Sequence, residues 1–286
     1  MAGKNERQRR QARERHRRQQ EQRLVRQRQV RRRWAIGTLA VLVAAGVGTL
    51  LLVFLPGGSP KKASASASKS PSATASAKAV AEPAHHCSYA SATPVAKKVS
   101  FPSATPDYTN SYQATLNTNQ GKITFNLLNN KATCTVNSFV HLAEAGYFNN
   151  TQCHRLLTSG IYVLQCGDPY ATGTAKLNCS ATSKIGSGTP GYDFASENLT
   201  GAKYPAGTVA MANEGSATTN GSQFFIVFKD STSGLTASYT PFATVSSGLG
   251  IVQNVAKDGY SCQYAQSGGG APKKKVIIDS VTIKKT

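Results

Sequence analysis

Twenty-two consecutive residues, from Trp34 to Leu55, carry no charge, and this run constrains the organisation of the chain more than any other feature. Because about 20 apolar residues suffice to cross a bilayer as a helix, the run predicts a transmembrane helix over residues 34–55. A cleaved signal peptide is the rival interpretation, but its basic and apolar regions would both be too long for that class. We therefore expect an uncleaved, single-pass anchor, with the folded part of the chain after it.

The segment that precedes this run, residues 1–33, is strongly basic. It holds thirteen arginines and one lysine against three glutamates, so it contributes +11 to the formal net charge of +20. With almost no apolar residues it cannot bury a core, and its charge could attract nucleic acid or anionic lipid. Because residues 31–33 are all arginine and adjoin the uncharged run, the positive-inside rule predicts a cytoplasmic N-terminus and an extracytoplasmic remainder. The basic tail then acts as a topology signal and membrane anchor, and we expect no nucleic-acid partner.

Residues 56–110 are rich in Ser, Ala, Pro and Lys and show no hydrophobic periodicity, so we expect a flexible linker there. His85, His86 and Cys87 fall inside it and could be read as a metal site. Three adjacent ligands without nearby partners make a weak site, however, and a solvated patch is the better interpretation.

The rest of the chain, residues 111–286, has the composition of a folded domain. It is long enough for one hydrophobic core, and its net charge is only +5. Short patterned segments with Gly-rich connections predict a mostly antiparallel β domain with two helices. Gly146 should end the first helix, whose apolar face includes Phe139 and Leu142. The expected elements are strands 112–116, 122–127 and 276–283, and helices 135–145 and 249–256.

Arg155 is the only arginine after residue 33. An ion pair with Asp168 or Glu214 is one interpretation of it. A planar guanidinium with five donors is nevertheless better suited than a lysine to fixed hydrogen bonding. Residues 158–160 have turn composition and β-compatible residues lie on both sides of them, so Arg155 should begin a hairpin.

A second strand is expected at residues 223–228, and its two faces differ. The odd-numbered positions put the amide of Gln223 beside the ring of Phe225, whereas the even-numbered positions are wholly apolar and belong in a core. No nucleophile is paired with a base, because His154 and Cys153 are adjacent on a strand and should point to opposite faces. Arginine, amides and rings on one surface indicate a peptide-binding floor rather than a hydrolytic site.

Four motifs occur in order along this part of the chain: His-Arg at 154–155, Gln-x-Gly-Asp-Pro at 165–169, Met-Ala-Asn at 211–213 and Asn-Gly-Ser-Gln-Phe-Phe-Ile at 220–226. The order and spacing of these motifs make residues 112–286 resemble the cyclophilin-type peptidyl-prolyl cis-trans isomerases. The resemblance implies a mostly β fold, a closed eight-stranded antiparallel barrel capped by two helices. It also implies rotation of Xaa–Pro peptide bonds with no cofactor or metal.

The resemblance assigns a role to each matching position. Arg155 would stabilise the twisted amide, and Gln165 would orient both Arg155 and the substrate. The residues that would hold the substrate polypeptide are Tyr162, Val163, Phe225, Leu235 and Tyr239 around the proline ring, and Ala212, Asn213 and Gln223 along the peptide backbone.

Rotating an Xaa–Pro bond means crossing a barrier of ~18–20 kcal/mol, because the amide loses its resonance. As the amide twists, the prolyl nitrogen regains a lone pair that can accept a hydrogen bond. A fixed guanidinium can donate that bond, and this is the chemistry expected of Arg155. The alternative is a proline-peptide-binding module or holdase chaperone of the same fold, in which turnover is incidental.

This chain departs from the family pattern in several places. The connection from Arg155 to Gln165 is about two residues longer than in the best-known members, so Tyr162 and Val163 are assigned by counting back from Gln165. Gly234 stands where a tryptophan often helps to bind the drug cyclosporin, and Tyr239 replaces a histidine, which leaves cyclosporin binding doubtful. An insertion between Pro169 and Ile185 flanks the groove and could alter substrate choice.

Six cysteines follow the predicted membrane span. An even number in an oxidising compartment favours disulfides, and six cysteines allow fifteen connectivities. Cys179 and Cys262 fall in loop-like stretches and are the first pair we expect. Cys153 and Cys166 lie in expected strands and could equally be buried free thiols.

Overall fold

The computed structural model describes residues 86–180, 183–264 and 267–286. The basic tail, the predicted transmembrane helix at 34–55 and the first part of the expected linker lie outside these residues. Within the described ranges, no helix is both long enough and apolar enough to cross a membrane.

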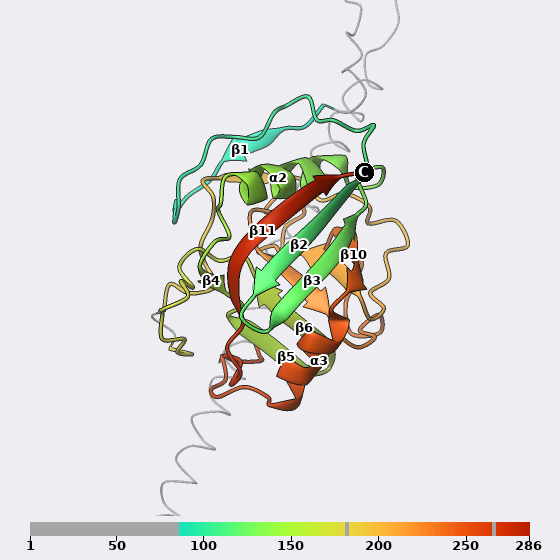
Figure 1. The fold of residues 1–286 in the computed structure, drawn as a ribbon. Coiled ribbons are helices and arrows are strands. Elements are labelled where there is room, and N and C mark those ends of the chain that lie inside the picture. Colours follow the sequence, from blue (N-terminus) through green and yellow to red (C-terminus); the bar gives the residue numbers. More distant parts are fainter. Residues whose placement is uncertain (1–85, 181–182, 265–266) are drawn as a thin grey trace, which may run out of the picture. The chain divides into compact units, whose positions relative to one another are not determined.

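The domain is built on one antiparallel sheet that curls around its core (Figure 1). Hydrogen-bonded neighbours follow the order β4-β11-β2-β3-β10-β8-β9-β6-β5, so the described sheet has nine strands where eight were expected. This order describes a curled antiparallel sheet in which only residues 153 and 154 separate β4 from β5 along the chain, and closure of the expected barrel stays a prediction. The mostly β architecture with two helices is confirmed. The strands of this sheet are β2 (Tyr112–Thr118), β3 (Gly121–Leu127), β4 (Thr151–Gln152), β5 (Arg155–Ser159), β6 (Ile161–Cys166), β8 (Thr208–Met211), β9 (Phe224–Val227), β10 (Pro241–Ser247) and β11 (Ile277–Lys285).

Helix α2 (Thr133–Glu144) lies at one end of the curled sheet, and α3 (Leu249–Lys257) lies at the opposite end (Figure 1). As expected, Phe139 and Leu142 of α2 are buried, and Gly146 follows the helix with φ of +63°. The helix begins two residues earlier than its sequence pattern suggested. The reason is distant in sequence: the Glu197 carboxylate accepts hydrogen bonds from the N–H groups of Cys134 (3.1 Å) and Thr135 (2.7 Å). A carboxylate at this end satisfies amides that have no partner within the helix.

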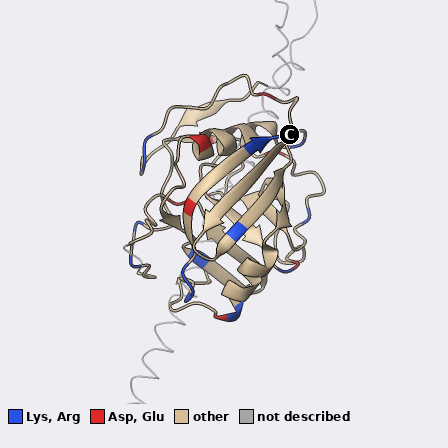
Figure 2. Cartoon of the chain, in the orientation of Figure 1, with Lys and Arg blue, Asp and Glu red and all other residues tan. Residues whose placement is uncertain are grey.

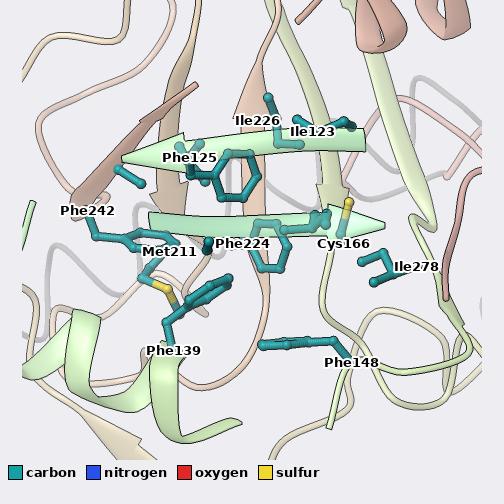
Figure 3. Packing of buried hydrophobic residues seen from close by; sticks show 14 of the residues in the cluster. Ile123, Phe125, Phe139, Phe148, Cys166, Met211, Phe224, Ile226, Phe242 and Ile278 are labelled. Carbon is teal, nitrogen blue, oxygen red and sulfur yellow. The ribbon is translucent and has the colours of Figure 1, made fainter. Parts of the chain in front are cut away.

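Aromatic rings from the helix and the sheet form the centre of the core (Figure 3). The ring of Phe139 lies 5.3 Å from that of Phe148, 5.5 Å from that of Phe224 and 5.2 Å from that of Phe242. Phe224, Ile226 and Phe228 all belong to this cluster, as the alternation in residues 223–228 predicted. Burying the even-numbered face of β9 leaves its odd-numbered face for the opposite surface of the sheet.

Residues 86–110 belong to the folded domain, although the sequence predicted a linker as far as residue 110. Cys87 forms a disulfide with Cys134, and strands β1 (Tyr89–Ser91) and β7 (Tyr192–Phe194) form a separate two-stranded sheet. Lys97 Nζ donates to the carbonyl of Gly146, beyond the other end of α2 (2.9 Å). The segment therefore runs along this helix (Figure 1). Composition did not reveal this, because the segment is ordered by bonds to residues far along the chain rather than by a core of its own.

All six cysteines lie in the described residues and are paired. The expected pair Cys179–Cys262 is confirmed. Cys153 and Cys166, for which a disulfide and free thiols were both open, are bonded to each other, with their Cα atoms 4.0 Å apart. The disulfide Cys87–Cys134 also excludes Cys87 as a free metal-binding thiol.

Charged residues are distributed over the domain without forming a basic stripe on the side shown in Figure 2. Lysines are scattered over strands and loops there, with acidic residues between them. This agrees with the small net charge of residues 111–286.

Candidate active site

Arg155 and Gln165 face each other across the hairpin of β5 and β6. They are register partners, and Arg155 Nη1 donates to Oε1 of Gln165 (2.9 Å). The predicted hairpin is confirmed, but its turn is tighter than the sequence suggested: Ser159 pairs with Ile161, and only Gly160 lies between them. With φ of +74°, Gly160 adopts a backbone conformation that residues other than glycine rarely adopt.

The floor beside this pair comes from the outward face of three neighbouring strands. Gln165 of β6 is the register partner of Phe225 in β9, and Phe225 is in turn the partner of Ala210 in β8. Phe225 and Val163 belong to a small buried cluster that is separate from the main core. The sheet thus has an apolar cluster on each side, and the smaller one supports the candidate site.

A pocket opens over this floor, and eight of the ten site residues predicted from the sequence line it. Its apolar side is closed by half-buried Leu235 and by Tyr239, whose ring lies edge-on to that of Phe225 with the centroids 5.5 Å apart. Asn213 is held at the rim, because its Nδ2 donates to the carbonyl of Ser238 (2.8 Å). The pocket is lined by Arg155, Ile161, Val163, Gln165, Ala212, Asn213, Phe225, Leu235 and Tyr239.

Tyr162 does not line this pocket, in contrast to the expectation from the sequence, and Ile161 lines it instead. Side chains alternate along β6, so Ile161, Val163 and Gln165 share one face, whereas Tyr162 points to the other. There the ring of Tyr162 packs edge-on against that of Phe228 at 6.0 Å. Counting back from Gln165 in steps of two would have selected Ile161.

Gln223 lies outside the apolar pocket but is linked to Arg155 through Gln165. Gln165 Nε2 donates to Oε1 of Gln223 (2.9 Å), and Gln223 Nε2 donates to the carbonyls of Gly186 (3.1 Å) and Gly188 (3.2 Å). Two side-chain amides therefore connect the guanidinium with the loop that follows the insertion. The sequence placed both amides on the surface but gave no sign that they bond to each other.

The other side of the guanidinium is held by main-chain oxygens. Arg155 Nε donates to the carbonyl of Gly268 (3.0 Å), and Nη2 donates to the carbonyl of Ser267. No carboxylate of the described chain lies within ion-pair distance of Arg155, so the ion pairs with Asp168 and Glu214 are not formed. Burial lowers the pKa of the Arg155 guanidinium, but arginine remains charged at any physiological pH.

His154 points away from the pocket and into the protein. It is 1% exposed, and neither ring nitrogen has a hydrogen-bond partner among the described residues. Burial, with a smaller contribution from the charge of Arg155, lowers the pKa of His154 to about 3. The ring is therefore neutral at physiological pH and serves neither as a base nor as a cation.

A second pocket adjoins the first, and the two share Gln165, Ala212 and Asn213. Asp193 and Glu214 line this second pocket, and no lysine or arginine of the described chain does. Burial, and next the charge of Glu214, raise the pKa of Asp193. A peptide that occupies the first pocket can therefore place a neighbouring side chain beside two acidic groups.

The chain is similar to known proteins of one family. Residues 113–283 match the family model described as cyclophilin type peptidyl-prolyl cis-trans isomerase/CLD. A probable peptidyl-prolyl cis-trans isomerase B of Mycobacterium leprae is 42% identical over 217 residues, covering 69% of this chain and 66% of the relative. Its namesake in Mycobacterium tuberculosis (strain H37Rv) is 43% identical over 182 residues, covering 58% of this chain and 52% of the relative. The match thus spans about half to two thirds of each relative.

Among solved structures, a Cryptosporidium parvum cyclophilin type peptidyl-prolyl cis-trans isomerase is 26% identical, with a TM-score of 0.48, and the match covers 62% of this chain and 99% of that one. The family model alone spans more than half of this chain and includes every predicted site residue. The chain belongs to the cyclophilin-type peptidyl-prolyl cis-trans isomerase family.

Proposed function

We propose that this chain accelerates cis–trans isomerisation of Xaa–Pro bonds in polypeptides. The observation that carries the proposal is a guanidinium fixed at the edge of an apolar pocket. The pocket can hold a proline ring, and three of the five N–H donors of Arg155 are already bonded to protein oxygens. One N–H on Nη1 and one on Nη2 are left for the substrate.

In this mechanism Phe225 and Leu235 hold the proline ring, and Gln165 and Asn213 hold the peptide backbone. Arg155 then donates a hydrogen bond to the prolyl nitrogen once its lone pair becomes available in the twisted amide. Since the planar amide lacks that lone pair, the bond favours the transition state over both ground states. No group is transferred and no cofactor or metal takes part.

The direct test is the exchange rate of a short proline peptide, measured by NMR with the purified full-length chain. Spontaneous exchange takes tens to hundreds of seconds, and we expect the chain to make it far faster. The same peptide with alanine in place of proline should compete poorly. If the peptide binds but its exchange rate stays at the spontaneous value, the chain is a binding module and not an isomerase.

The acidic lining of the second pocket should favour substrates with a basic residue next to the proline segment. We expect peptides with lysine near the proline to bind about two- to fivefold more tightly than glutamate counterparts, a modest effect because Glu214 is exposed. High salt should reduce the difference. Fluorescence anisotropy measures the affinity of each peptide for the wild type and for Asp193→Asn/Glu214→Gln. The charged residue of the peptide is moved one position at a time relative to the proline. An equal preference in wild type and variant would exclude the carboxylates as its source.

We further propose that residues 34–55 anchor the domain to the outer face of the cell membrane, where it acts on exported proteins. The uncharged run and the arginines before it support this topology. Three disulfides are also typical of an oxidising compartment. The expected result is a chain in the membrane fraction whose domain is cleaved by protease added outside intact spheroplasts. Protection of the domain from that protease would contradict the proposed orientation.

A further inference from the structure

The segment that holds the guanidinium of Arg155 is itself tied down by a disulfide. Ser267 and Gly268, whose carbonyls accept hydrogen bonds from Arg155, follow Cys262 by a few residues, and Cys262 is bonded to Cys179 in the insertion. Resting on the function proposed above, we propose that the Cys179–Cys262 disulfide is a positioning element of the catalytic centre, which keeps these two carbonyls on Arg155.

The segment contacts the catalytic hairpin over a short stretch of main chain. Gly270 and Leu156 exchange two backbone hydrogen bonds, of 2.8 and 3.0 Å, directly after Arg155. Gly269, with φ of +63°, approaches so closely that an added Cβ would lie 2.4 Å from the carbonyl oxygen of Leu156. This contact fixes the end of the segment that follows the two carbonyls.

The end that precedes the two carbonyls is held less firmly by the main chain. Gly268 N donates to the carbonyl of Tyr264 (3.2 Å) and Tyr264 N to that of Gly269 (2.9 Å), so the segment folds mostly on itself. The phenolic oxygen of Tyr264 donates to the carbonyl of His154 at 3.2 Å. The covalent bond at Cys262 is thus the strongest attachment on this side.

The partner half of the disulfide belongs to a loop that is also connected to Arg155. Cys179 and Gly186 both lie between Pro169 and Pro190, and the carbonyl of Gly186 accepts from Gln223 at the end of the amide chain. The guanidinium is therefore held from one side through Gln165 and Gln223, and from the other by the segment bonded to Cys179. Through Cys179, the insertion that flanks the groove would also help to orient the catalytic donor.

The test compares the full-length Cys179→Ser/Cys262→Ser variant with a matched control, Cys87→Ser/Cys134→Ser, which removes a disulfide on the helix α2 side. We expect kcat to fall about tenfold in the first variant, because a small misplacement of a catalytic group costs that much or more. Its affinity for a proline peptide should change little, because no residue of the apolar pocket is altered. The control should keep both values.

A spectroscopic readout separates positioning from activity. The Nε–H of Arg155 donates to Gly268, and its NMR resonance can be identified because it disappears in Arg155→Lys. In Cys179→Ser/Cys262→Ser this resonance should shift and exchange faster with solvent, while the control keeps the wild-type signal. This readout does not depend on turnover, so it still tests whether the disulfide positions Arg155 if the wild type proves inactive.

Two outcomes would overturn the proposal. One is a folded variant with wild-type kcat and an unchanged Arg155 resonance. The other is a variant that unfolds under conditions where the control stays folded, because the disulfide would then support the domain as a whole rather than the position of one side chain.

Discussion

Replacing Arg155 with lysine is expected to lower kcat/KM for Xaa–Pro isomerisation by about 100-fold or more, the loss typical of removing one preorganised donor from a transition state. Lysine keeps the positive charge but has no planar fork, so it cannot bond Gln165, Ser267 and Gly268 together and still aim a donor at the pocket. Arg155→Ala should lose at least as much. NMR exchange of a proline peptide measures both variants.

The fold and the peptide affinity are the controls for this result. Arg155 is only partly buried, and the apolar pocket does not require its charge, so thermal unfolding and peptide binding should remain close to those of the wild type. Loss of kcat with retained binding would locate the guanidinium in the transition state. If Arg155→Lys kept most of the wild-type activity, charge alone would suffice and the fixed geometry would be irrelevant.

The second large effect is on stability in acid. The pKa of His154 is about 3 in the folded protein and near 6.5 in an unfolded chain. Between these values the unfolded state binds one more proton, so the free energy of unfolding falls as the pH is lowered through this window. With each pKa unit equivalent to 1.36 kcal/mol, the full loss is about 5 kcal/mol. Above pH 6.5 the histidine should have no effect on the pH dependence.

Replacing His154 with leucine isolates this contribution, since other groups also titrate in acid. The variant fills a similar volume and removes two buried ring nitrogens that have no hydrogen-bond partner in the described part of the chain. Denaturant unfolding at several pH values should therefore give a flatter profile below pH 6.5 than in the wild type. His86→Leu, at an exposed position, should keep the wild-type profile. Parallel profiles for wild type and His154→Leu would show that the buried ring does not drive the acid transition.

The sequence predicted the parts of the site that depend on local pattern. Alternation in residues 223–228 separated the core face of β9 from its pocket face, and the turn composition of residues 158–160 placed Arg155 and Gln165 on one hairpin. Alternation along β6 likewise puts Ile161, and not the predicted Tyr162, on the face that carries Val163 and lines the pocket. That difference could have been resolved from the sequence alone.

The remaining features depend on contacts between distant residues, and no local pattern reports them. Glu197 binds the start of α2, and the carbonyls of Ser267 and Gly268 reach Arg155 from more than a hundred residues away. Main-chain carbonyls are the same for every residue type, so composition cannot identify them as partners. The run of glycines at 268–270 has the composition of an ordinary loop. Its close approach to Leu156 nevertheless requires glycine at position 269.

The disulfide between Cys87 and Cys134 determines how the domain would respond to mechanical load. A pulling force that arrives along the chain at residue 86 passes through the sulfur atoms into the first turn of α2. Residues 88–133, which include β1, β2 and β3, are bypassed and bear none of this tension while the bond is intact. Reducing that one bond would move the load onto the β1–β7 pairing, the least extensive sheet in the domain.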